Sequence, residues 1–174
     1  MVFAYYKRLS RRQQAIYRQS AAIEHMRLTD AHAFFPLTDE LATAMAGEDQ
    51  KVISRISSEL IAELCRSLKA PMASVRVLAK RPSDDWGELH GLYEPVDRNQ
   101  TARITVWMRT AQKKKVVAFR TFLRTLLHEL CHHLDYELFS LEESFHTEGF
   151  YKRESSLFHQ IVRDAATKPS PKVA

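Results

Sequence analysis

The chain has 174 residues, 45% of them hydrophobic, and this size and composition fit one globular domain with short extensions. Two cysteines are too few for a disulfide scaffold or a four-cysteine zinc ribbon, and no apolar run reaches the roughly 20 residues of a transmembrane helix. The net charge of +5 predicts a solvated basic face; nucleic-acid binding is the more weakly supported alternative, because no helix-turn-helix or aromatic-interleaved basic motif accompanies the charge. The N-terminal stretch lacks the features of a secretory signal, so we expect a cytoplasmic protein without membrane contact.

The N-terminal part of the chain is predicted to be helical. Residues 8–30 carry an irregular apolar stripe, and residues 1–37 are interpreted as a helical extension of the domain. A second helix is expected over residues 38–46, with Thr38 as its N-cap. In residues 50–68 the apolar side chains recur at spacings of three and four, which predicts an amphipathic helix.

The pattern then changes to the alternation that is typical of strands. Residues 74–78 and 101–110 alternate apolar and polar side chains, and residues 87–93 form a weaker third candidate. We expect a small antiparallel sheet in which the strand of residues 101–110 is half-buried. The free edge of this strand could pair with an extended peptide, with Trp107 and Arg109 bordering a cleft, or it could be an ordinary exposed edge.

Two further helices are expected toward the C-terminus, over residues 116–138 and 150–163, before a disordered tail at residues 166–174. This order of elements predicts an α+β domain over residues 38–165. In this domain a sheet of about three strands packs on the helix of residues 116–138, with other helices before and after it. The cleft is expected between the edge of the sheet and that helix.

The helix of residues 116–138 carries a His-Glu-x-x-His pattern at His128, Glu129 and His132. Residues four apart on a helix lie about 40° apart around its axis, so both imidazoles can reach one metal ion. Zn²⁺ prefers such nitrogen ligands, and Glu129 can take a proton from a zinc-activated water and pass it to a leaving amine. A surface histidine pair without metal is the alternative. The position of both histidines opposite the leucine stripe of the helix favours the metal site.

A catalytic zinc site needs a third protein ligand. His146 lies fourteen residues after His132, beyond a loop that leaves room for the chain to turn back. Gly149 can ease this approach, and Phe150 can anchor the next helix in the core. His146 is therefore our candidate for the third ligand. Competing candidates are the nearby carboxylates Asp135, Glu142, Glu143, Glu148 and Glu154.

Other polar residues near the pattern have alternative interpretations. Asp135 either accepts the second ring N–H of a ligand histidine or is a solvated carboxylate. Cys131 is expected to pack in the core, although a thiol in this place could compete for metal. His133 projects more than about 90° away from the ligand pair, and His159 is interpreted as a surface histidine, so neither is a candidate ligand.

Several segments together resemble one known family. They are Gly91-Leu92-Tyr93, Ile104-Thr105-Val106, His128-Glu129-Leu130-Cys131-His132 and His146-x-x-x-Phe150. Over roughly residues 50–163 the chain resembles the SprT-like branch of the zincin metallopeptidases; the first histidine motif is common to zincins, and the second points to this branch. The resemblance implies a zincin-like fold, zinc, a catalytic glutamate at Glu129 and cleavage of peptide bonds, in some members of proteins attached to DNA.

Two classes of function remain open from the sequence. The first is a zinc metallopeptidase that acts on a protein or peptide substrate, either generally or on one dedicated partner. The alternative is a zinc-containing binding or regulatory module, with nucleic acid as a conceivable partner and without general protease activity. Substitution of Glu129 distinguishes them, because only the first requires this carboxylate for its activity.

Overall fold

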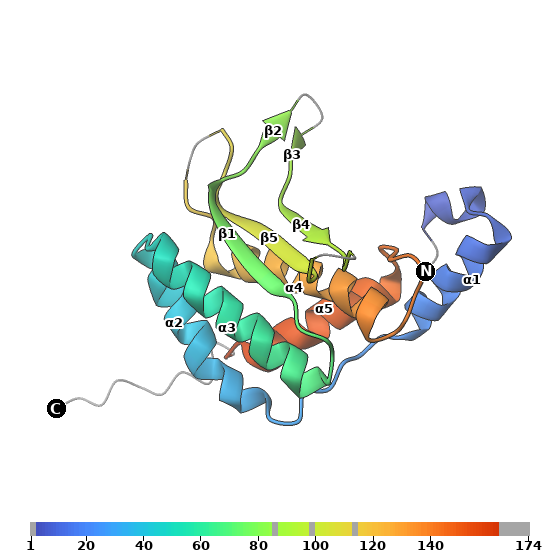
Figure 1. Cartoon of the computed structure of the whole chain (residues 1–174), viewed down its shortest axis with the longest axis horizontal. Coiled ribbons are helices and arrows are strands. Elements are labelled where there is room, and N and C mark those ends of the chain that lie inside the picture. The colour runs from blue at the N-terminus through green and yellow to red at the C-terminus, as the bar shows by residue number, and fades with distance from the viewer. Residues whose placement is uncertain (1–2, 85–86, 98–99, 113–114, 164–174) are drawn as a thin grey trace.

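The computed structural model describes residues 3–84, 87–97, 100–112 and 115–163, and these form an α+β structure (Figure 1). The expected disordered tail, residues 166–174, lies outside the described residues. Among the helices so described, none combines the length and the hydropathy that a membrane crossing requires. In chain order the elements are η1 (Ala4–Arg8), α1 (Arg11–Ala22), η2 (Ala31–Phe34), α2 (Phe35–Ala46), α3 (Gln50–Leu68), β1 (Ser74–Lys80), β2 (Ser83–Asp84), β3 (Gly87–Glu88), β4 (Gly91–Glu94), β5 (Arg103–Arg109), α4 (Phe119–Glu137) and α5 (Glu148–Ile161).

The first α-helix is shorter than the sequence predicts. α1 ends at Ala22, so the prediction of one helix over residues 8–30 is wrong beyond that point. At the end of α1 the buried guanidinium of Arg153 donates to the carbonyl oxygens of Ser20 and Ile23, at 2.7 and 2.6 Å. These carbonyls therefore have a partner without a further helical turn, which is how a contact distant in sequence ends the helix.

α2 and α3 form as predicted, with a difference where α2 begins. α2 starts at Phe35, and Pro36 occupies its first turn, where a missing N–H costs no hydrogen bond. Thr38 is therefore inside the helix and is not its N-cap; its buried hydroxyl donates to the carbonyl oxygen of Ile161 at 2.9 Å. α3 ends at Leu68, and its C-cap Lys69 adopts the left-handed conformation with a φ of 56°.

The three-stranded sheet has the order β1-β5-β4 and is mixed. β5 pairs antiparallel with β4 but parallel with β1, so the prediction of an antiparallel sheet is wrong for the second pair. Alternation of apolar residues reports which faces of a strand are buried and carries no information on strand direction. β5 is also the central strand, and every residue from 104 to 108 is buried. Trp107 is accordingly only 6% exposed. Both interpretations of this strand, a peptide-binding edge and an ordinary exposed edge, assumed that it lies at the edge of the sheet, so neither holds.

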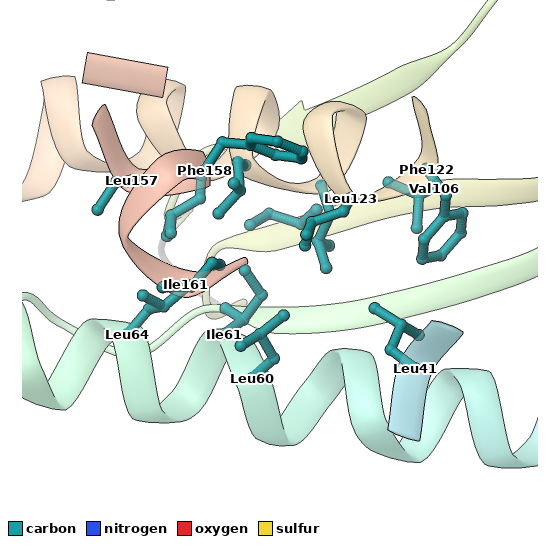
Figure 2. Close-up of a cluster of buried hydrophobic side chains, with 14 of the residues drawn as sticks. Leu41, Leu60, Ile61, Leu64, Val106, Phe122, Leu123, Leu157, Phe158 and Ile161 are labelled. Atoms are coloured by element: carbon teal, nitrogen blue, oxygen red, sulfur yellow. The ribbon is translucent and has the colours of Figure 1, made fainter. Parts of the chain in front are cut away.

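The core lies between α3 and the pair α4 and α5. α3 packs against α2 and β1, whereas α4 packs against β4, β5 and α5. Figure 2 shows side chains of α3 facing those of the other two helices, and these are fully buried: Leu60, Ile61, Leu64, Leu123, Phe158 and Ile161. Each such side chain contributes roughly 1.5–3 kcal/mol through removal from water. α4 is thus fixed by its apolar side, and its polar side is left to form a site.

Candidate metal centre

Three histidine side chains converge beside α4. This helix presents His128 and His132 one turn apart, and the loop before α5 brings His146 to them. Nε2 of His146 lies 3.0 Å from Nε2 of His128 and 3.1 Å from Nε2 of His132. One ligand atom from each ring lies within 4.8 Å of the other two, so the group could hold a metal ion. The three residues selected from the sequence are therefore together in the structure.

The start of α5 fixes the position of the third histidine, His146. Thr147, directly after His146, caps α5 by accepting a hydrogen bond from the backbone N–H of Phe150 at 3.0 Å. Phe150 is fully buried, as predicted for a core anchor. Its ring centroid lies 4.9, 4.8 and 5.1 Å from the centroids of the three histidine rings, in chain order. One aromatic side chain thus supports all three imidazoles.

The outer nitrogens of the two helix histidines are engaged in hydrogen bonds. Nδ1 of His128 lies 3.1 Å from Oε2 of Glu154, and Nδ1 of His132 lies 2.7 Å from Oγ of Ser144. Ser144 itself donates to Oδ2 of Asp135 at 2.7 Å, so its oxygen is left to accept from the imidazole. These partners assign the ring proton to Nδ1 and leave a lone pair on Nε2 of both histidines.

This assignment of protons makes the cluster suited to a cation. Nε2 of His146 carries at most one proton in the neutral ring, so it cannot donate to both neighbouring Nε2 atoms. At least one of the two short contacts therefore lacks a well-aligned proton, and a cation between the nitrogens would stabilise it. The cluster therefore offers three nitrogen ligands to a metal ion but too few protons to be a fully hydrogen-bonded group.

The environment favours the neutral form of His132 and His146, the form that metal ligation requires. Burial, followed by the nearby charges of His128, His146 and Arg153, lowers the pKa of His132 to about 3. Partial desolvation, together with the neighbouring His128, also lowers the pKa of the more exposed His146 below its ordinary value. At neutral pH both rings can therefore bind a metal ion without first losing a proton.

The carboxyl group of Glu129 is enclosed between α4 and β4. The side chain is 7% exposed, and its burial raises the pKa from 4.5 to about 7, against an opposing effect of His128. The carboxyl group lies against Gly91 of β4, where an added β-carbon would stand 2.3 Å from Oε1. With the carboxyl group in this position, only glycine leaves room, a requirement that the spacing of residues along the chain does not reveal.

A cleft of about 730 Å³ opens beside the three histidines, between β4 and α4. The cleft lies where the sequence predicts it, but its strand is Gly91–Glu94 and not the strand of residues 101–110. β4 is an outer strand of the sheet, so it forms the edge next to the site. The cleft is lined by Leu89, His90, Gly91, Leu92, Tyr93, Pro95, Thr121, Arg124, Thr125, His128, Glu129, His132, Tyr136, Ser144, His146 and Glu154.

The carboxylates considered as competing ligands have other partners. Side chains of α1 hold Glu142 and Glu143, and a lysine of α5 pairs with Glu148. Glu154 supports a ligand histidine through its outer nitrogen. Asp135 is fully buried and reaches a ligand only through Ser144, so it is neither a solvated carboxylate nor a direct partner of a ligand ring.

The remaining candidates near the motif also have defined places. Cys131 is fully buried, as expected for a packing role, and this burial raises the pKa of its thiol. His133 points away from the ligand pair, and its Nε2 lies 2.8 Å from the carbonyl oxygen of Pro71. His159 is exposed, as expected. The structure thus brings only the three predicted histidines together, among the residues that it describes.

Sequence analysis missed Gly91 and Ser144 as supporting residues and considered Glu154 only as a ligand. Their roles depend on contacts between separate elements, and the spacing of residues within one helix does not predict such contacts. Compared with models of protein families, with curated proteins and with solved structures, the chain gives no match. The resemblance to SprT-like zincins therefore stays a prediction.

Proposed function

We propose that this protein is a zinc-dependent metallopeptidase in which Glu129 is the general base. The observation that supports this most is the meeting of three imidazole nitrogens beside a buried carboxyl group, at the side of an open cleft. A purely structural metal site is normally closed by a fourth protein ligand. Three ligands next to a base and a cleft are instead the arrangement of a hydrolytic site.

The donor set favours zinc as the metal. Imidazole suits zinc, copper, iron and nickel, and three protein nitrogens with one open position are typical of catalytic zinc. Zn–N bonds of about 2.0–2.1 Å in tetrahedral geometry place neighbouring nitrogens about 3.3 Å apart. The two separations of 3.0 and 3.1 Å between Nε2 atoms lie close to this value, and the three ligand atoms all lie within 4.8 Å of one another. Zinc in this place would polarise a peptide carbonyl and lower the pKa of a water molecule to about 7.

Glu129 has the properties of a base that works near neutral pH. A pKa of about 7 lets its carboxyl group take up a proton and release it again at little free-energy cost in either direction. A cation next to it would favour the carboxylate form and prepare the group to accept a proton. Glu129 would then take the proton of the attacking water and return it to the leaving amine.

The edge of the sheet offers a binding mode for a peptide substrate. β4 pairs with β5 on one side, and an extended peptide could add to its other side by backbone hydrogen bonds. Leu89 and Leu92 line the same cleft and are 42% and 40% exposed, so they offer apolar contacts to substrate side chains. The proposed substrate is therefore an extended stretch of a protein or peptide. A zincin-like fold and a cytoplasmic location are parts of the same proposal.

The proposal is tested by measuring zinc content and hydrolysis together. Purified wild-type protein should contain about one zinc per chain, and His146→Ala should lose most of it. Glu129→Gln should keep zinc, because Glu129 is not a ligand, and should lose cleavage of a mixture of proteome-derived peptides followed by mass spectrometry. Cleavage by Glu129→Gln at the wild-type rate would refute the role of Glu129, and wild-type protein that binds no zinc would refute the metal centre.

A further inference from the structure

Residues 3–24 run along the loop that carries the third histidine, as Figure 1 shows for α1 and the segment between α4 and α5. The hydroxyl of Tyr5 donates to the backbone carbonyl of His146 at 3.0 Å. Arg12 holds Glu142, in the middle of this loop, with two hydrogen bonds of 2.7 and 2.6 Å. The N-terminal segment thus contacts the loop at its middle and at the backbone of the ligand residue His146.

A second connection runs from the end of α1 to His132. The guanidinium of Arg153 binds the carbonyl oxygens that end α1 and also donates to Oδ1 of Asp135 at 2.6 Å; both side chains have 0% exposure. Asp135 accepts from Ser144 at 2.7 Å, and Ser144 lies 2.7 Å from Nδ1 of His132. A buried charged pair that makes several hydrogen bonds has few alternative geometries. The position of α1 is therefore transmitted to the ligand ring.

The fit of α1 against α5 is close enough to make this connection specific. A β-carbon at Gly149 would stand 2.5 Å from the carbonyl oxygen of Ser20 and 2.6 Å from that of Ala21. The hydroxyl of Ser20 also lies 3.2 Å from that of Thr147, the residue after the third ligand. His128, in contrast, is held by Glu154, which Arg124 also contacts, and all three belong to α4 and α5.

We infer that residues 3–24 are a positioning segment for two of the three metal ligands, His132 and His146. This inference rests on the metal centre of the proposed function. Docking of the segment sets the loop and the orientation of one ring before the metal arrives, so less ordering remains to be done on binding. By linkage, the bound metal holds the segment in place to the same extent that the segment favours the metal.

The first test compares two hydroxyl deletions on the same short helix. Tyr5→Phe keeps the ring, which lies 5.9 Å from that of Tyr17, and removes only the donor to His146. The matched control is Tyr6→Phe, whose hydroxyl accepts from Arg18 instead. Zinc affinity is measured by competition with a chromophoric chelator. Tyr5→Phe should weaken zinc binding about 3- to 10-fold, because the variant loses one hydrogen bond. It should also alter the visible spectrum of the Co²⁺-substituted protein, whereas Tyr6→Phe should do neither.

The second test measures the reciprocal effect. Zinc should slow amide hydrogen exchange in residues 3–24 of the wild-type protein several-fold, and His146→Ala should abolish this protection. Equal zinc affinity of the two tyrosine variants, or exchange in residues 3–24 that ignores zinc, would overturn the inference even if zinc binds and peptides are cleaved. Wild-type protein that binds no zinc would instead refute the proposed function on which the inference rests.

Discussion

Glu129 of α4 and Gly91 of β4 are so close that a β-carbon on the glycine would lie 2.3 Å from Oε1 and 2.8 Å from both Cδ and Cγ of the glutamate. The edge strand therefore determines where the carboxyl group of Glu129 can be. The same strand encloses this group, and burial raises the pKa of Glu129 to about 7. One contact between an edge strand and a helix thus controls both the position and the proton affinity of the proposed base.

Substitution of Gly91 by alanine should impair hydrolysis and spare zinc binding. The new methyl group would force the carboxyl group of Glu129 to move, and displacement of a catalytic group by about 1 Å can cost about 100-fold in rate. We expect kcat to fall about 10- to 100-fold with unchanged zinc content. The control is Gly47→Ala, because its added β-carbon would meet its nearest atoms at 3.6 and 3.8 Å, an ordinary contact. Wild-type kcat in Gly91→Ala would show that the carboxyl position is not critical.

The pKa of Glu129 predicts a dependence of stability on pH in the metal-free protein. The pKa is raised in the folded state, so the folded protein binds more protons than the unfolded chain between about pH 4.5 and 7. The stability contributed by this group is therefore present at low pH and is lost as the pH rises through 7. Glu129→Gln removes the effect, and it should stabilise the protein by roughly 2–3 kcal/mol more at pH 8 than at pH 4.5.

The measurement is urea denaturation of both proteins at the two pH values with a chelator present. The difference between variant and wild type isolates Glu129 from His132, whose lowered pKa acts in the opposite direction: its contribution is lost as the pH falls from 6.5 toward 3. A constant difference between the two proteins across this pH range would mean that the folded state does not raise the pKa of Glu129.

Ser144 is expected to contribute to metal affinity without touching the metal. Its oxygen accepts from His132, and its hydroxyl donates to the buried carboxylate of Asp135. Ser144→Ala frees the ring to change its tautomer and orientation, so zinc affinity should fall about 10- to 100-fold. Chelator competition measures this, with Ser58→Ala on α3 as the control, since that hydroxyl bonds only within its own helix, to Ser54. Equal affinities of the two variants would contradict the role of Ser144.

Much of the candidate site could be predicted from the sequence because it follows helical geometry. The spacing of His128 and His132 places them on one side of a helix whatever the rest of the chain does. His146 required only a nearby residue of the right chemistry after a loop. The helices and strands were predicted from the periodicity of apolar residues. This periodicity reflects which side of an element is buried, so it predicts elements that pack in the core well.

What could not be predicted depends on contacts between separate elements. The direction of β1 relative to β5 is set by the path of the intervening chain, which alternation does not encode. α1 ends where Arg153, far along the chain, binds its carbonyl groups. The need for glycine at position 91 arises only when β4 meets Glu129. These are tertiary effects that override local preference.

Gly149 offers the most direct way to separate α1 from α5. An alanine there would bring its methyl group within 2.5–2.6 Å of the backbone oxygens of Ser20 and Ala21, and backbone cannot move aside as a flexible side chain can. We expect Gly149→Ala to lower the free energy of unfolding by about 1–3 kcal/mol, the usual effect of overpacking. Because α1 also positions ligands, zinc affinity should fall in the same variant, whereas Gly47→Ala should change neither quantity. Urea denaturation with a chelator measures the first effect and chelator competition the second; unchanged stability would show that the two helices do not pack this closely.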